Sequence, residues 1–275
     1  MNPTAELPLE DNHLDILGKA QRGLNFADAE LAARAAISPA EFAQLRAGEI
    51  NPEPLQRLAA ALGLHPRALL QAARKTWRPQ PHSLAGLQMF TTPFGDMTVN
   101  AYLAWDAASR QAVAFDSGAD ADAMLACLAA NGLKLAHILI THTHGDHIYD
   151  LDRLREKTGA PAWCGAREPA LAGTNAFAAG KVFQTGALTI ETRLTWGHAE
   201  GGITYVVRGL ARPLAVVGDA IFAGSMGGGK VSYATALRTT RAEILSLPDH
   251  TIIASGHGPL TTVAEEKLHN PFFAS

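Results

Sequence analysis

The spacing of apolar residues divides the chain into two parts. Over about the first 80 residues apolar side chains recur at intervals of three and four, with no strand-like alternation, which is the period of an amphipathic helix. Leu55, Leu58 and Leu62 form one such series. Ser38 followed by Pro39 is typical of a helix start, because serine caps the free amides and proline tolerates the first turn. This part of the chain is therefore predicted to be entirely helical.

The pattern changes after residues 77–81, where two prolines disfavour helix and suit a linker. Beyond this point short apolar strands alternate with helical stretches. The strands are predicted at residues 112–115, 137–140, 188–196, 214–217 and 251–254. The helices are predicted at residues 120–131, 149–157, 233–247 and 263–268. We predict a small all-α domain over residues 1–80 and an α/β domain over residues 81–275, in which helices cover a sandwich of sheets.

Composition narrows the class of protein. Apolar residues make up 47% of the 275 residues and charged residues 18%, so a substantial core is expected rather than disorder. The net charge of -3 predicts no general attraction to nucleic acid or to an anionic membrane. The N-terminus indicates neither a signal peptide nor a membrane span. The two cysteines, Cys127 and Cys164, form no paired motif and suit core packing. A cytoplasmic protein is expected.

Histidines and a carboxylate cluster directly after one apolar strand, in the run HTHGDH over residues 142–147. Alternation places His142 and His144 on the same side of an extended chain. Gly145 permits a turn, after which Asp146 and His147 can face a neighbouring site. Imidazole nitrogens and carboxylate oxygens are the ligands that zinc and similar divalent ions accept. The run is therefore predicted to bind metal.

One short segment cannot complete a metal site, so further ligands must come from elsewhere in the chain. His198, Asp219 and His257 each follow a predicted strand and each lie beside a glycine. A ligand at a strand end, next to a glycine that allows close backbone approach, suits a cleft at a sheet edge. Each of the three is ambiguous by itself. Together with the run at residues 142–147 they form a complete set.

From about Leu84 to its end the chain resembles the metallo-β-lactamase superfamily, whose HxHxDH signature is matched by residues 142–147. The resemblance implies an αβ/βα sandwich with metals at one sheet edge. It implies that the first metal is held by His142, His144 and His198. It implies that the second metal is held by Asp146, His147 and His257, and that Asp219 bridges the two.

Within that superfamily, residues 218–222 and 256–262 look most like short glyoxalase II-like hydrolases. Trp196 and Ser255 stand where the family usually has proline, which alters loop stiffness but removes no ligand. The basic residue that glyoxalase II has soon after the bridging aspartate is replaced by glycines, and Lys230 is displaced. The helical C-terminal domain of the full-length enzymes is absent from this sequence. The resemblance thus implies thioester hydrolysis with weak discrimination for glutathione.

The expected cofactor is a pair of divalent metal ions, with zinc as the first choice and iron or manganese as alternatives. Two ions about 3.5–4 Å apart can share a water and lower its pKa from about 15.7 toward ~7 for attack on a carbonyl. Asp146 and Asp219 are the predicted catalytic carboxylates. Asp116, after the strand at residues 112–115, is predicted either to orient a ligand histidine or to cap a turn. Tyr233 and Lys230 are the candidate general acids.

Residues from about 12 to 75 resemble a Cro/repressor-type helix-turn-helix domain, with residues 29–34 as its first helix and residues 38–47 as its recognition helix. Residues 1–80 contain nine Lys/Arg and nine Asp/Glu, whereas DNA binding requires a basic face. A dimerisation module that gives a homodimer, or a lid over the metal cleft, is therefore favoured.

The expected partner is a small-molecule substrate. Two alternative functions stay open: a DNA-binding regulator whose metal domain senses a metabolite, and a single-iron persulfide dioxygenase that uses the same first three ligand types. The complete second set of ligands disfavours the dioxygenase, and the charge balance of the helices disfavours the regulator.

Overall fold

The computed structural model of the protein describes residues 7–275 and begins with a region of five helices. Ser38 caps the third of them, accepting from the Glu41 amide while the Glu41 side chain accepts from the Ser38 amide. The five helices are α1 (His13–Leu24), α2 (Asp28–Arg34), α3 (Pro39–Arg46), α4 (Pro52–Ala61) and α5 (Pro66–Arg74). The predicted all-helical N-terminal region is confirmed. Its likeness to a helix-turn-helix domain and a domain boundary at residue 80 stay predictions.

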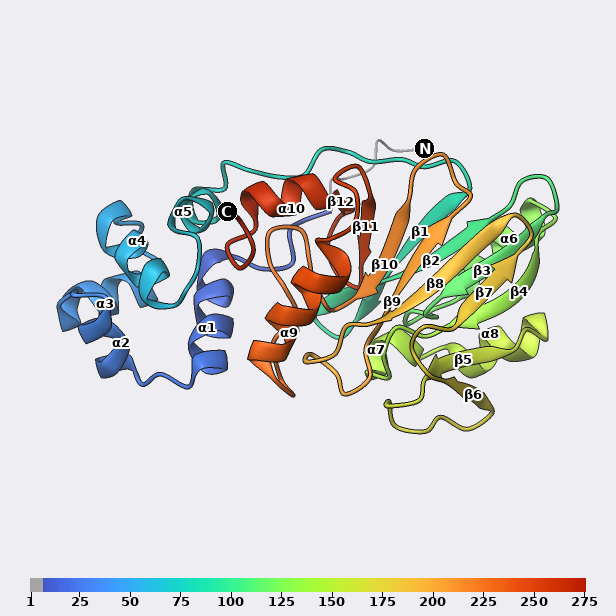
Figure 1. Cartoon of the computed structure of the whole chain (residues 1–275), viewed down its shortest axis with the longest axis horizontal. Coiled ribbons are helices and arrows are strands. Elements are labelled where there is room, and N and C mark those ends of the chain that lie inside the picture. Colours follow the sequence, from blue (N-terminus) through green and yellow to red (C-terminus); the bar gives the residue numbers. More distant parts are fainter. Residues whose placement is uncertain (1–6) are drawn as a thin grey trace.

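The rest of the chain forms two six-stranded sheets that stack face to face (Figure 1). The first sheet has the order β1-β2-β3-β4-β5-β6 and the second β12-β11-β10-β9-β8-β7. The first sheet contains β1 (Leu87–Phe94), β2 (Met97–Trp105), β3 (Gln111–Phe115), β4 (Lys134–Leu139), β5 (Ala162–Gly165) and β6 (Thr174–Phe177). The second contains β7 (Val182–Thr185), β8 (Leu188–Leu194), β9 (Ile203–Arg208), β10 (Leu214–Gly218), β11 (Ile252–Ser255) and β12 (Thr261–Thr262).

Helices cover the outer face of each sheet, which gives the predicted αβ/βα sandwich. Leu128 and Leu154 pack against the first sheet from α6 (Asp122–Ala130) and α8 (Leu151–Thr158), and a short α7 (Gly145–Ile148) precedes α8. The second sheet is covered by α9 (Tyr233–Thr239), the π-helical turn η1 (Thr240–Ile244) and α10 (Val263–His269). Between the sheets lies a separate core that includes Phe115 and Tyr205. No helix within residues 7–275 is long and apolar enough to cross a membrane.

Most predicted elements are confirmed, and the departures have local causes. The helix predicted over residues 233–247 is wrong as a single α-helix, because its second half is the π-helical turn η1. The prediction also missed β2, whose middle is buried on both faces and therefore shows no alternation. It missed β1, β6, β7, β9 and β12 as well. Cys164 belongs to the core between the first sheet and its helices, and the half-buried Cys127 packs against that core. Both are free thiols.

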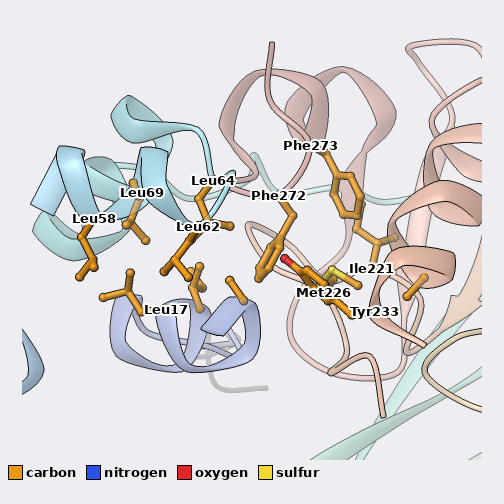
Figure 2. Close-up of a cluster of buried hydrophobic side chains, with 14 of the residues drawn as sticks. Leu17, Leu58, Leu62, Leu64, Leu69, Ile221, Met226, Tyr233, Phe272 and Phe273 are labelled. Carbon is orange, nitrogen blue, oxygen red and sulfur yellow. The ribbon is translucent and has the colours of Figure 1, made fainter. Parts of the chain in front are cut away.

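The N-terminal helices pack directly on the covering helices of the second sheet. Figure 2 shows Leu17 and Leu62 of the helical region in one cluster with Met226, Tyr233 and Phe272. This apolar cluster is continuous from α1, α4 and α5 to the outer face of the second sheet. Such burial is the main source of stability at an interface of this kind. The five helices therefore form one packed body with the sandwich.

Candidate metal centre

All seven side chains predicted as ligands meet at one edge of the sandwich. His198, Asp219 and His257 follow β8, β10 and β11. These three strands run in the same direction, since β10 is parallel to β11 and both β8 and β10 are antiparallel to β9. Their carboxyl ends therefore share an edge. The run at residues 142–147 follows β4 of the facing sheet and approaches the same place.

The first group contains His142, His144, His198 and Asp219, whose ligand atoms lie within 4.8 Å of one another. His144 Nδ1 lies 2.9 Å from His142 Nε2 and 3.0 Å from His198 Nε2. Asp219 Oδ2 lies 3.3 Å from His198 Nε2. Ligand atoms on a tetrahedral zinc ion, each about 2.0–2.1 Å from the metal, would be about 3.3 Å apart. The spacing of this group thus matches a four-ligand site.

The second group contains Asp146, His147 and His257. Asp146 Oδ2 lies 3.4 Å from His257 Nε2 and 3.6 Å from His147 Nε2. Asp219 reaches this group as well, because its Oδ1 lies 3.3 Å from His147 Nε2 and its Oδ2 lies 3.4 Å from His257 Nε2. Asp219 is therefore placed between the two groups.

Four of the histidines are oriented by a hydrogen bond at the outward-facing ring nitrogen. Their Nδ1 atoms meet the Thr141 hydroxyl at 3.1 Å for His142, Asp116 Oδ2 at 2.7 Å for His147, the Gly228 carbonyl at 2.9 Å for His198 and the Thr98 carbonyl at 2.6 Å for His257. A proton held at Nδ1 leaves the Nε2 lone pair free to face the centre. This is the arrangement that metal-binding histidines require.

Asp116 takes the orienting role of the two roles predicted for it. Besides contacting His147, its carboxylate accepts hydrogen bonds from the Thr141 amide and hydroxyl, both at 2.7 Å. The Thr141 hydroxyl donates to Asp116 and can then accept from His142. One buried carboxylate thus orients two histidines.

Two buried atoms at the centre, His147 Nε2 and Asp219 Oδ1, lie 3.3 Å apart but make no hydrogen bond of good geometry with each other or with any other described residue. A buried polar atom without a partner is costly. Both atoms face the centre, where a bound cation would satisfy them. The donor set of imidazole nitrogens and carboxylate oxygens suits a divalent ion such as zinc. The residues present therefore fit a pair of metal ions.

The pKa shifts point the same way. Burial holds the pKa of His142 well below its usual value and lowers the pKa of His144 and His198, so these rings are neutral and can donate a lone pair. Burial also opposes a charge on His147 and His257, but nearby aspartates outweigh it. Asp116 and Asp219 raise the pKa of His147 to about 10, and Asp146 and Asp219 raise that of His257 to about 11. The second group therefore attracts positive charge.

Glu168 is a residue of this centre that the sequence analysis missed. It follows β5, and its side chain is 8% exposed. One carboxylate oxygen accepts from the Thr143 amide at 2.8 Å and the Thr143 hydroxyl at 2.7 Å. The other accepts from the Gly201 amide at 2.6 Å. Its place just after a strand was the available signal, but its role depends on two loops distant in sequence.

The two candidate general acids lie in different surroundings. Tyr233 packs in the apolar cluster, with its ring centre 6.4 Å from that of Phe272, and burial raises its pKa to about 12. A role for Tyr233 as a general acid is therefore wrong. Lys230 is exposed and close enough to His144 and His198 to lower the pKa of each. It lies near the first group.

A family model and individual relatives of this chain agree on one family. The family model described as "Metallo-beta-lactamase superfamily" matches residues 94–257. The probable metallo-hydrolase YqgX of Bacillus subtilis is 31% identical over 205 residues, which cover 66% of this chain and 94% of that protein. The hydroxyacylglutathione hydrolase GloC of Haemophilus influenzae is 27% identical over 201 residues, covering 64% of this chain and 93% of that protein.

Two solved structures share the fold. The B3 metallo-beta-lactamase BLEG-1 superposes with a TM-score of 0.59 at 29% identity, covering 68% of this chain and 100% of that chain. TTHA1623, solved in a di-iron-bound form, superposes with a TM-score of 0.55 at 25% identity, covering 66% of this chain and 99% of that chain. In both comparisons about a third of this chain lies outside the similarity.

Proposed function

The chain belongs to the metallo-β-lactamase superfamily, a group that consists generally of metal-dependent hydrolases, and we propose that it hydrolyses an activated acyl compound, with a thioester as the favoured class. The observation that carries the proposal is the position of Asp219 between two groups of ligand atoms. A carboxylate so placed can bridge two cations. The proposed cofactor is therefore a pair of divalent ions.

In this proposal His142, His144 and His198 would hold the first ion, Asp146, His147 and His257 would hold the second, and Asp219 would serve both. Zinc is the favoured metal because imidazole nitrogens dominate the ligand set. Iron and manganese are the alternatives, and one similar structure was solved in a di-iron-bound form. When bound, such a pair activates a water molecule and polarises the carbonyl of the substrate.

The chain's own residues orient the ligands and limit the access of water to the centre. Asp116 keeps a proton on Nδ1 of His147, and the Thr98 carbonyl does the same for His257. Burial of His142 and His147 limits the access of bulk water, which strengthens electrostatic interactions at the centre. Glu168 holds the loop of His142 and His144 against the loop that follows His198.

A thioester suits this centre because its leaving group needs no proton. A thiol has a pKa of about 8.5, so a thiolate departs far more readily than an amine. Because Tyr233 is buried in the apolar cluster, Lys230 is the remaining candidate general acid. Hydroxyacylglutathione, after which the relative GloC is named, is itself a thioester. A nucleic-acid substrate is disfavoured because residues 81–275 carry fourteen Lys/Arg against seventeen Asp/Glu.

Elemental analysis during metal titration tests the dinuclear centre. Protein purified without added metal should reach close to two ions per chain. Saturation at one ion, with Asp146 and His257 dispensable for binding, would contradict a dinuclear mechanism and favour the single-iron dioxygenase alternative.

A substrate panel tests the acyl class. The values of kcat/KM on metal-replete protein should be higher for acyl thioesters than for aryl esters or nitrocefin, with little preference for S-lactoylglutathione over other thioesters. Nitrocefin as the best substrate by roughly tenfold, a discrimination of about 1.4 kcal/mol in transition-state binding, would overturn the proposal. So would the absence of activity on every thioester.

The proposed cellular setting rests on the two cysteines. Free Cys127 and Cys164 suit a reducing compartment such as the cytoplasm. A homodimer formed through the N-terminal helices is the proposed assembly.

A further inference from the structure

The loop at residues 219–228 carries one proposed ligand and orients another. It begins with Asp219 and ends with Gly228, whose carbonyl accepts from His198 Nδ1 at 2.9 Å. The Gly227 amide donates to the Asp219 carbonyl at 3.1 Å and closes the loop on itself. In its middle, Phe222 lies edge-on to the His257 ring at a centroid distance of 5.5 Å. The position of this loop therefore affects both groups of ligands.

Residues of the N-terminal region hold the middle of this loop. Lys19 of α1 donates from Nζ to the Met226 carbonyl at 2.9 Å and forms an ion pair with Asp11. The Asp11 carboxylate also accepts a hydrogen bond from the Ser225 hydroxyl at 2.5 Å. Lys19 Nζ lies 5.0 Å from the centre of the Phe222 ring. The side chains of Lys19 and Asp11 are only 16% and 8% exposed, so solvent screens these contacts weakly.

Helix α1 is seated closely enough to keep these contacts in register. A methyl group added at Gly23 would lie 2.2 Å from Cγ of Tyr233, so the helix backbone rests directly on that ring. Leu17 on the same helix enters the apolar cluster that contains Met226 and Tyr233 (Figure 2). The chain before α1 also passes the loop of His257, since a methyl group at Gly258 would lie 3.4 Å from the Glu10 amide nitrogen.

The opposite side of the loop is held by α10 and the residue that follows it. Asn270 Nδ2 donates to the Ser225 carbonyl at 2.7 Å, and the Gly224 amide donates to Glu266 Oε2 at 3.0 Å. Both side chains are fully buried. The loop is thus held on one side by α10 and Asn270 and on the other side by the N-terminal region.

We propose that Asp11 and Lys19 are positioning residues of the metal centre, and that the N-terminal helical region serves to hold the loop at residues 219–228 in its metal-binding arrangement. The inference rests on the proposed metal centre but not on its substrate. Loss of one member of a buried ion pair leaves the other charge uncompensated. Asp11 without Lys19 would therefore move toward solvent and take Ser225 with it, which would shift Asp219 and the carbonyl that orients His198.

The test measures zinc affinity of the full chain by competition with a chromophoric chelator, at a temperature well below the unfolding transition. Lys19→Met removes the ammonium group, and with it the contacts to Asp11, the Met226 carbonyl and the Phe222 ring, and keeps the apolar stem. We expect it to weaken zinc binding about tenfold, the lower end of the cost of losing an orienting partner. Lys19→Arg, which retains the charge, should recover most of the affinity. Arg22→Met, on the same helix but exposed, is the matched control and should bind zinc as the parent protein does.

A second pair of variants separates positioning from stability. Gly23→Ala forces α1 away from Tyr233, whereas a methyl at Gly18 meets only the flexible Arg22 side chain. Gly23→Ala should weaken zinc binding and Gly18→Ala should not. If Lys19→Met does not fold, Ser225→Ala removes the Asp11 contact alone and should weaken zinc binding in the same direction. Zinc affinity of the Lys19 or Ser225 variant within about twofold of the parent, a change below ~0.5 kcal/mol, overturns the proposal. Failure of the parent protein itself to bind zinc, iron or manganese would instead overturn the proposed metal centre.

Discussion

Glu168 and Thr143 form two hydrogen bonds that fasten the HTHGDH run to a second loop of the centre. Thr143 lies between His142 and His144, and its amide and hydroxyl both donate to one oxygen of Glu168. The other oxygen accepts from the amide of Gly201, three residues after His198. One buried carboxylate therefore links the loop of His142 and His144 to the loop that follows His198.

Replacing this carboxylate is expected to weaken the first group selectively. Glu168→Gln leaves one acceptor oxygen for three donors, so one of the two loops loses its anchor. Metal affinity should fall about 10- to 100-fold, as for other groups that orient ligands. Competition with a chelator measures it, and Glu191→Gln, at an exposed ion pair with Arg208, is the matched control. Unchanged affinity of the Glu168 variant would show that the loops keep their separation without it.

Asp219→Ala should remove more than any single terminal ligand, because Asp219 contacts both groups. We expect metal content to fall from close to two ions per chain and kcat/KM to fall by at least about 100-fold, the upper end of the cost of outer partners. Elemental analysis and initial rates measure the two effects, and far-UV circular dichroism should show a retained fold. Asp249→Ala, which breaks an exposed ion pair with Lys267, is the control. Turnover of Asp219→Ala at the parent rate would refute its assignment.

Metal binding should release protons at neutral pH. Nearby aspartates raise the pKa of His147 to about 10 and of His257 to about 11, so in the metal-free protein both rings carry an extra proton at pH 7. A metal ion must displace these protons, so apparent affinity should rise with pH, by up to about tenfold per unit for each proton displaced. Titration in weakly buffered solution should detect release of about two protons per chain from this group. Binding without proton release would contradict the prediction.

The same two protons should affect the stability of the metal-free protein. Because the pKa of each ring is raised on folding, their stabilising contribution is complete below the unfolded histidine value of about 6.5. It is then lost as the pH rises through the folded values of about 10 and 11. Chemical denaturation of metal-free protein should therefore show this contribution declining on the alkaline side. Its increase with pH in that range would contradict the assignment.

The N-terminal helices are not expected to bind DNA tightly. In addition to the balance of charges over residues 1–80, arginines are paired with acids: Arg34 with Glu30 at 2.9 Å and Arg57 with Glu53 at 3.1 Å. The predicted recognition helix corresponds to α3, at the end of the molecule farthest from the sheets (Figure 1). A gel-shift titration with random duplex at physiological salt should give a Kd no tighter than about 10⁻⁶ M, the non-specific range. Nanomolar binding to any specific duplex would support the regulator alternative.

The seven ligand-type residues of the centre and the class of fold can be predicted from the sequence. His142, His144, Asp146 and His147 lie within six positions after an apolar strand, so local spacing alone marked them as ligand-type residues. His198, Asp219 and His257 each follow a strand next to a glycine, and this position marks them as further candidate ligands. Strand alternation and helical periodicity are local properties, and the αβ/βα sandwich followed from them with the family resemblance. β2 was not predicted because burial on both faces removes the alternation of apolar and polar residues.

How these residues are held depends on contacts between segments that are distant in sequence. Glu168 joins Thr143 to Gly201, and Asp11 and Lys19 reach Ser225 and Met226 across more than 200 positions of sequence. No periodicity encodes such contacts, because they depend on how loops and helices pack after the local elements have formed. The same holds for Tyr233, whose residue type suited a general acid until its burial against Phe272 and Gly23 placed it in the core. Local spacing selects ligand-type residues, whereas their orientation depends on hydrogen bonds between distant segments.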